Sequence, residues 1–214
     1  MKSTLPGSVE ERATARVDRK RQAIIAAARR QFYLEGYGAT TVDAIGRDAG
    51  IGKATIYKHF GSKEALFSAV VAQENRHGLD DVQTTLLGAG SLKQRLTRAG
   101  FILLDLLTAP EFIASYRMVM SEATRLPTIA TLYYGGAEQL HAVLSECFQS
   151  LVASADLRHH SAERSAEHFV GLVRGDLQLR ALLGMTPPTL KERADIVSSG
   201  VEVFLAAYGP AEPG

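Results

Sequence analysis

The sequence predicts an all-α protein, and two kinds of observation support this. Apolar residues recur at helical spacing along most of the 214-residue chain, so they fall on one face of each segment. Three hydroxyl residues, Thr40, Ser91 and Thr189, are each followed three positions later by an acidic or amide side chain, the pattern of a capping box at a helix start. At this length the chain has room for one large domain, or for one small and one medium domain.

The first segment, residues 1–17, is expected to be a disordered basic arm. It carries Ser, Thr, Pro, Gly and mixed charges without a sustained period. Its end and the residues just after it are basic, at Arg16, Arg19, Lys20 and Arg21, and these side chains could either contact a polyanion or simply be solvated. The first helix is expected from about Asp18 to Leu34, with Glu35-Gly36 as its stop.

Two short amphipathic segments follow around a glycine-containing turn. The first is expected to begin at Thr40 and to end at Gly50, which can take the left-handed conformation that closes a helix. The second, from about Lys53 to His59, has few apolar residues, and its remaining side chains are hydrogen-bond donors suited to phosphate oxygens and base edges. This pattern predicts a helix-turn-helix for DNA in a domain spanning residues 18–63. An ordinary helical hairpin with a solvated basic face is the alternative.

Two nucleotide-binding interpretations of the glycines fail. A P-loop would need a glycine at position 47 and a hydroxyl at position 54, where the chain has Arg47 and Ala54. A dinucleotide-binding fingerprint at Gly36-Tyr37-Gly38 lacks the third glycine and a preceding strand.

Charge is distributed unevenly along the chain. Residues 1–63 contain twelve basic and six acidic residues, whereas residues 64–214 contain twelve and seventeen. Because the positive charge lies where the DNA motif lies, it favours attraction of a polyanion to that domain.

The chain has no apolar run long enough for a membrane span and no secretion signal, so we expect a cytoplasmic protein without a membrane partner. Cys147 is the only cysteine, so an intramolecular disulfide is impossible. Its side chain is expected to serve in packing.

The C-terminal domain is expected over residues 64–209, before a tail at 210–214. Ser62 caps its first helix, which joins the two domains and runs to about Gln83. Further helices are expected at 91–107, 111–123, 127–155, 161–183 and 189–208. Gly135-Gly136 should kink or break the third of these, because each glycine weakens a helix by about 1 kcal/mol relative to alanine. The helix over residues 161–183 carries apolar residues far around its surface, so it is expected to form the dimer interface together with the last helix.

The helix-turn-helix segment resembles the DNA-binding domain of the TetR family of bacterial regulators. The residues from Thr41 to Leu66 match T-x-x-x-I-x-x-x-A-G-I-x-x-x-T-I-Y-x-H-F-x-x-K-E-x-L. Residues 110–132 and 169–184 are similar to the C-terminal domain of the AefR-like branch. The resemblance implies a three-helix DNA-binding domain followed by a helical ligand-binding and dimerisation domain. It also implies phosphate or base contacts from eight residues, namely Thr41, Lys53, Ala54, Thr55, Tyr57, Lys58, His59 and Lys63, and a core of Ile45, Ala49, Ile51, Ile56 and Phe60.

A ligand cavity is expected among the middle helices, between Ser91 and Phe148. The aromatic, polarizable or hydrogen-bonding residues that could line it are Phe101, Leu104, Phe112, Tyr116, Met120, Tyr133 and His141. For each of them, packing in the core is the alternative. Charged residues on a mostly apolar helix usually pair with one another. We therefore expect a structural ion pair, rather than a ligand anchor, among Arg174, Asp176 and Arg180. His159, His160 and His168 lack the spacing of metal ligands, so neither a metal nor a cofactor is expected.

Together these features predict a homodimeric transcriptional regulator. We expect a repressor that binds a partly palindromic operator in double-stranded DNA and is released by a small, largely apolar or aromatic effector. A ligand-independent or activating regulator, or a non-specific DNA-binding protein, is the alternative. The chain has no nucleophile–base or metal constellation, so we do not expect an enzyme.

Overall fold

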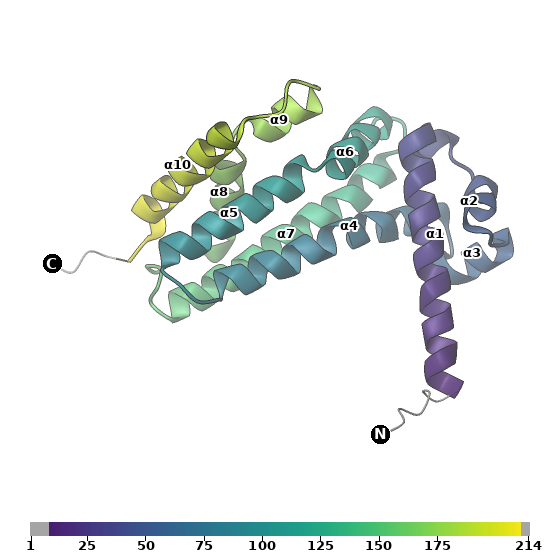
Figure 1. The fold of residues 1–214 in the computed structure, drawn as a ribbon, viewed down its shortest axis with the longest axis horizontal. Coiled ribbons are helices and arrows are strands. Elements are labelled where there is room, and N and C mark those ends of the chain that lie inside the picture. Colours follow the sequence, from purple (N-terminus) through teal and green to yellow (C-terminus); the bar gives the residue numbers. More distant parts are fainter. Residues whose placement is uncertain (1–8, 211–214) are drawn as a thin grey trace, which may run out of the picture. The chain divides into compact units, whose positions relative to one another are not determined.

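The computed structural model describes residues 9–210, with the side chains of residues 9–13 and 74–77 excepted. All regular elements in this range are helices (Figure 1), so the predicted all-α class is confirmed. The chain divides into two compact units, Met1–Val70 and Val71–Gly214. The first unit holds α1 (Val9–Ala39), α2 (Val42–Ala49), α3 (Lys53–Phe60) and the start of α4 (Lys63–Leu86).

An aromatic cluster forms the centre of the N-terminal unit. Phe32 and Tyr37 come from α1 and Phe67 from α4, and all three are buried. Their ring centroids lie 5.3 to 5.5 Å apart, two of the pairs edge to face. Such pairs add to the stabilisation that comes from burial alone, so this cluster fixes α1 to the beginning of α4.

Helix α1 corrects the prediction of a disordered arm over residues 1–17. The helix begins at Val9, and residues 1–8 lie outside the described part. Residues 9–17 contain Glu, Arg and Ala but neither Pro nor Gly, so their helix propensity is good. The basic residues from Arg16 to Arg21 therefore lie on a helix. Gly36, the expected stop, interrupts α1 with φ 80°, but helical geometry resumes to Ala39.

The start of α2 lies one residue later than predicted. Thr41, not Thr40, caps the helix by accepting a hydrogen bond from the backbone N–H of Ala44. Thr40 is buried, and its hydroxyl lies 2.7 Å from the carbonyl oxygen of Gly36. A buried hydroxyl needs such a partner, so tertiary burial decided which of the two threonines became the cap.

The C-terminal unit contains the remainder of α4 and six more helices among the described residues. These are α5 (Leu92–Thr108), α6 (Pro110–Glu122), α7 (Pro127–Ala153), α8 (Ala162–Arg174), α9 (Leu177–Leu182) and α10 (Leu190–Tyr208). Both side chains of the predicted capping boxes at Ser91 and Thr189 make their reciprocal hydrogen bonds. These two predicted helix starts are therefore confirmed.

Two breaks in this unit differ from the predicted ones. Helix α7 runs without interruption through Gly135 and Gly136, since packing along a long helix outweighs a local loss of about 1 kcal/mol per glycine. The helix expected over residues 161–183 is divided at Gly175, whose φ of 52° and ψ of −136° favour glycine. Asp176 then occupies the N-cap position of the short α9, which starts at Leu177.

The core of the C-terminal unit is closed around Phe148, Phe169 and Phe204. All three side chains are 0% exposed, and their ring centroids lie 5.1 to 5.6 Å apart. Cys147 lies in the same core, and burial raises the pKa of its thiol to about 11. A thiol that stays protonated is a poor nucleophile, which agrees with its predicted role in packing.

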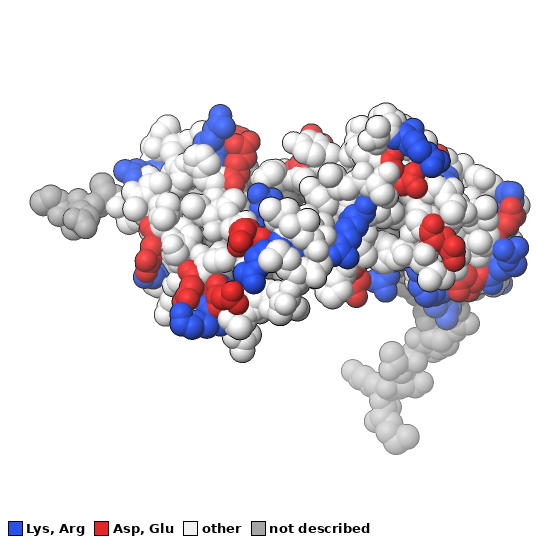
Figure 2. All heavy atoms as spheres, turned by 90° about the horizontal axis from the view of Figure 1, so that it is seen from above, with Lys and Arg blue, Asp and Glu red and all other residues white. Residues whose placement is uncertain are grey.

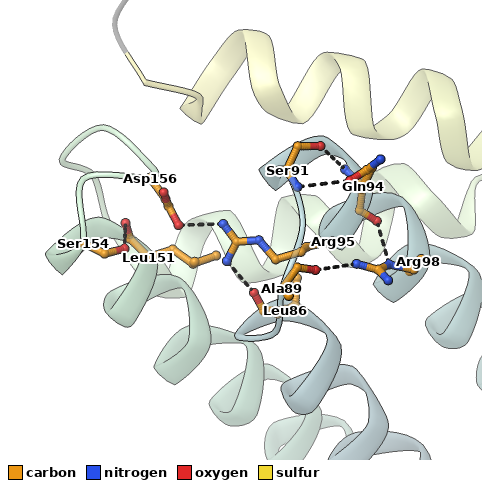
Figure 3. Close-up of polar contacts among 9 residues, drawn as sticks. All are labelled: Leu86, Ala89, Ser91, Gln94, Arg95, Arg98, Leu151, Ser154 and Asp156. Atoms are coloured by element: carbon orange, nitrogen blue, oxygen red, sulfur yellow. Dashed lines mark hydrogen bonds and ion pairs between the residues drawn. The ribbon is translucent and has the colours of Figure 1, made fainter.

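A buried arginine fastens three segments together near this core (Figure 3). Arg95 of α5 donates to the carbonyl oxygen of Leu86, the last residue of α4, at 2.9 Å. It also pairs with Asp156 between α7 and α8 at 2.6 Å. The nearby Arg98 donates to the carbonyl oxygen of Ala89 but is exposed. Arg95 therefore holds the end of α4 in place within this unit.

Charged side chains on the face drawn in Figure 2 lie as neighbouring basic and acidic groups separated by wide uncharged areas. Exposed ion pairs such as Lys191–Asp195 and Arg164–Glu167 belong to this kind of surface, and each contributes little to stability. Within the described residues no single helix has the length and hydropathy to cross a membrane. Helices α5 and α6 meet the length and hydropathy criteria only when they are taken together, and they are bent by 52° at the break between them.

Candidate DNA-binding surface and ligand cavity

Helices α2 and α3 form a compact helix-turn-helix. Gly50 ends α2 with φ 66° and ψ 30°, and the N–H of Ile51 donates to the carbonyl oxygen of Gly46 at 2.9 Å. A Cβ atom at Gly46 would lie 2.7 Å from the carbonyl oxygen of Ile51, closer than van der Waals contact allows. Gly46 thus permits the tight turn, a role that periodicity alone did not reveal.

The predicted core of this motif is largely observed. Ile45 and Ile56 are buried, while Ala49, Ile51 and Phe60 are half-buried. Burial of Ile56 on one side of α3 leaves the opposite side of this short helix facing outward. Lys53, Ala54, Tyr57 and Lys58 of α3 are exposed, and Thr55 and His59 are half-buried. Six of the eight residues predicted to contact DNA therefore lie on α3.

Lys53 has a partner that must be exchanged if it contacts DNA. Its Nζ lies 2.7 Å from Asp43 Oδ2, and both side chains are about half exposed. The hydrogen bond from Lys53 to Asp43 raises the pKa of the lysine, so the ammonium stays charged at neutral pH. An exposed pair of this kind is held weakly, and a phosphate or a base edge can replace the carboxylate.

Lys63 has a structural role that the sequence did not indicate. Its Nζ donates to the carbonyl oxygens of Tyr37 and Thr40, both at 2.9 Å. The same atom lies 4.3 Å from the centroid of the Tyr37 ring, within the range of a cation–π contact. Lys63 therefore fastens the end of α1 to the start of α4, and a contact with DNA would come in addition to this role.

A cavity of about 550 Å³ lies in the C-terminal unit, within the size range of small-molecule sites. Five of the seven residues predicted to line it do so: Phe112, Tyr116, Met120, Tyr133 and His141. Phe112, Tyr116 and Tyr133 form an aromatic wall with ring centroids 5.7 to 6.3 Å apart. Aliphatic side chains complete the wall, contributed by Leu79, Leu106, Leu107, Val119, Leu140 and Val170.

Phe101 and Leu104 are not among the lining residues, so these two predictions are wrong. Leu104 is 0% exposed in the main core, and Phe101 packs against that core. Both lie on α5, whose contribution to the cavity comes instead from Leu106 and Leu107 near its C-terminal end. Spacing along one helix could not tell which turn faces the core and which faces the cavity.

The polar side of the cavity includes two residues from α8 and α9. Gln178 is buried and donates through Nε2 to the carbonyl oxygen of Leu107 at 3.2 Å. Its Oε1 accepts a hydrogen bond from Arg174 Nη1, also at 3.2 Å. The predicted ion pair among Arg174, Asp176 and Arg180 is not formed, because Arg180 pairs with Glu192. Arg174 lines the cavity instead.

The three histidines do not gather into a metal site. Nδ1 of His168 lies 2.5 Å from the hydroxyl of Tyr208, and Nδ1 of His160 lies 2.6 Å from the carbonyl oxygen of Arg158. The described residues contain no group of three or more His, Cys, Asp or Glu side chains that could hold a metal ion.

The fold and the helix-turn-helix define a DNA-binding transcriptional regulator, and comparison with known proteins gives its family. A family model described as "Bacterial regulatory proteins, tetR family" matches residues 24–70. A second, described as "AefR-like transcriptional repressor, C-terminal domain", matches residues 94–210, more than half of the chain. The protein belongs to the TetR family and has a C-terminal domain of the AefR-like type.

Individual relatives agree with this assignment over nearly the whole chain. The HTH-type transcriptional regulator BetI of Rhizobium meliloti is 28% identical over 193 residues, which cover 89% of this chain and 91% of that protein. The solved structure of the flavonoid-responsive regulator FrrA is 30% identical with a TM-score of 0.74, over 91% of this chain and 99% of that one. A structure from Mesorhizobium loti assigned to the TetR family is 28% identical with a TM-score of 0.80, over 91% and 98%.

Proposed function

We propose that the protein is a homodimeric repressor that binds a partly palindromic operator through α3 and leaves it when a small apolar or aromatic effector fills the cavity. One observation supports this most directly: helix α4 begins at Lys63, within the DNA-binding unit, and carries Leu79, which lines the cavity. A Cβ atom at Gly78 would lie 3.2 Å from Leu106, another lining residue. Helix α4 is therefore packed closely against the cavity wall.

This continuity provides a route for coupling. An effector shifts the DNA-competent population only by its different affinity for two arrangements of the protein, and operator DNA must weaken effector binding by the same factor. A ligand that displaces Leu79 or Leu106 would act on α4, the helix that follows α3 in the chain. The name of FrrA, a flavonoid-responsive regulator, supports an aromatic effector, as does the wall formed by Phe112, Tyr116 and Tyr133.

The proposed dimer interface is formed by α8 and α10. Val203 of α10 is 51% exposed, so Val203→Glu would place a charge on the outer face of that helix without disturbing the core. Phe204 cannot serve this purpose, because it is 0% exposed within its own chain and Phe204→Glu would unfold the unit. We expect Val203→Glu to weaken dimerisation and operator binding together, as measured by sedimentation and by fluorescence anisotropy.

The experiment that tests the proposal selects binding sites from random double-stranded DNA and footprints the protein on the best of them. A two-fold dimer predicts half-sites centred about 34 to 36 Å apart, or a multiple of that distance. Titration of the complex with an aromatic compound library should then identify ligands that release the DNA. A single asymmetric half-site bound by a monomer would contradict the dimer. Tight cavity ligands that never change operator affinity would contradict effector release.

The contacts proposed for Thr41, Lys53, Ala54, Thr55, Tyr57, Lys58, His59 and Lys63 can be tested through salt dependence. Lys58 is exposed on α3, and Lys58→Ala should lower the slope of log affinity against log salt by about one unit. Lys63→Ala is the informative partner variant, because loss of its two carbonyl contacts should also lower thermal stability. An unchanged slope for Lys58→Ala would remove this lysine from the phosphate contacts.

A further inference from the structure

We propose that the effector is an aromatic carboxylic acid whose carboxylate is bound by Arg174. This inference rests on the proposed function, in which the cavity is the effector site, and it gives the effector a chemical class. It combines three features of the cavity: one guanidinium without a carboxylate partner, a buried amide that orients that guanidinium, and an aromatic wall.

The charges around the cavity favour an anion. Its lining includes one arginine and one carboxylate, Arg174 and Glu167. Glu167 is already paired with Arg164, at 3.2 Å. Within the described part of the chain Arg174 forms no ion pair, and its one side-chain hydrogen bond goes to Gln178. The guanidinium thus keeps further N–H donors for a ligand, and a cationic ligand would be repelled by it.

Gln178 gives Arg174 a defined orientation. The amide is 7% exposed and is fixed by its own hydrogen bond to the carbonyl oxygen of Leu107. Its Oε1 holds Arg174 Nη1 at 3.2 Å, so less side-chain freedom remains to be lost when a ligand binds. A planar guanidinium held in this way suits a carboxylate, which it can bind through two parallel hydrogen bonds.

The rest of the cavity indicates an aromatic body for the same ligand. Phe112, Tyr116 and Tyr133 line the cavity within ring-contact distance of one another, and aromatic rings at such distances attract one another beyond the effect of the area they bury. Aliphatic side chains cover most of the remaining surface. A volume of about 550 Å³ is enough for a ligand with two linked or fused rings.

The test compares acids with neutral amides of the same shape. We would measure binding of biphenyl-4-carboxylate and 2-naphthoate, and of the two corresponding carboxamides, to the free full-length protein by calorimetry at pH 7.5. Each acid should bind at least about tenfold more tightly than its amide, the factor expected from one hydrogen bond to a charged group. Arg174→Gln should remove this preference, and Arg174→Lys should retain part of it.

Lys191→Gln is the matched control, because Lys191 is an exposed basic residue of the same unit that is absent from the cavity lining and pairs with Asp195, which is also absent from it. It should leave the acid preference unchanged. The thermal stability of Arg174→Gln and its binding of the amides show whether the variant is folded. The proposal is overturned if acids and amides bind wild-type protein equally, if the acids fail to bind up to their solubility limit, or if Arg174→Gln retains the full preference.

Operator release by the same compounds is measured separately. Acids that bind through Arg174 without affecting DNA binding would support the ligand class and contradict the proposed release mechanism. Amides that release the operator as effectively as the acids would support release and overturn the preference for a carboxylate.

Discussion

The C-terminal unit contains two aromatic clusters built from similar residues and packed in opposite ways. Phe148, Phe169 and Phe204, the filled cluster, are completely buried, with ring centroids 5.1 to 5.6 Å apart. Phe112, Tyr116 and Tyr133, the hollow cluster, are half-buried and lie 5.7 to 6.3 Å apart around the cavity. Residue type therefore does not decide whether an aromatic group fills a core or lines a cavity.

The neighbouring elements make the difference. The filled cluster comes from α7, α8 and α10, which meet in the main core. The hollow cluster comes from α6 and α7, and α6 starts a new direction at Pro110 after the end of α5. Proline has no N–H with which to continue the helix of α5, and α6 is bent away from α5 by 52°, with the cavity beside it.

The largest expected effect separates the two clusters by stability. Phe169→Ala should lower the free energy of unfolding by about 3 to 5 kcal/mol, because it leaves a cavity in a closed core. Tyr116→Ala enlarges an existing cavity and should cost only about 1 to 2 kcal/mol, while it weakens effector binding. Urea denaturation of both variants, followed by far-UV circular dichroism, measures the two costs. Equal losses would show that the hollow cluster is as tightly packed as the filled one.

A second comparison concerns two arginines that both donate to carbonyl oxygens around the α4–α5 connection. Arg95 is buried and holds Leu86 and Asp156, whereas Arg98 is exposed and holds Ala89. Arg95→Met should lower the free energy of unfolding by about 1 to 3 kcal/mol, because a buried carbonyl oxygen loses its donor.

Arg98→Met, at a position open to water, should change stability by no more than about 0.5 kcal/mol. Thermal denaturation of the two variants side by side provides the measurement. Equal losses of stability in the two variants would show that the burial of Arg95 is not what holds the end of α4 in place.

The extent to which the sequence predicted the molecule differs between local and long-range features for a physical reason. In the helix-turn-helix, Gly50, Ile56 and the outward donors of α3 follow from local spacing, and local rules predicted them. Thr40, Lys63 and Arg174 instead make contacts with residues distant in the sequence or with a cavity that several helices create. Periodicity within one segment holds no information about such contacts. For the same reason, only five of the seven residues predicted to line the cavity do so.

The smallest expected effect concerns Gly135, on the helix that contributes Tyr133 to the hollow cluster. Sequence reasoning placed a break here, yet α7 is continuous, and a Cβ atom at Gly135 would meet no atom within 4 Å. Gly135→Ala should therefore raise the free energy of unfolding by about 0.5 to 1 kcal/mol, since alanine restricts the unfolded chain and favours the helix. Urea denaturation measures this gain, and calorimetry with biphenyl-4-carboxylate measures any change in ligand affinity.

A stabilised variant with unchanged affinity would show that the hollow cluster owes its open space to the placement of α6 rather than to flexibility in α7. A destabilised variant, or one that loses ligand affinity, would instead show that α7 must bend at this glycine, and would restore the break that the sequence predicted.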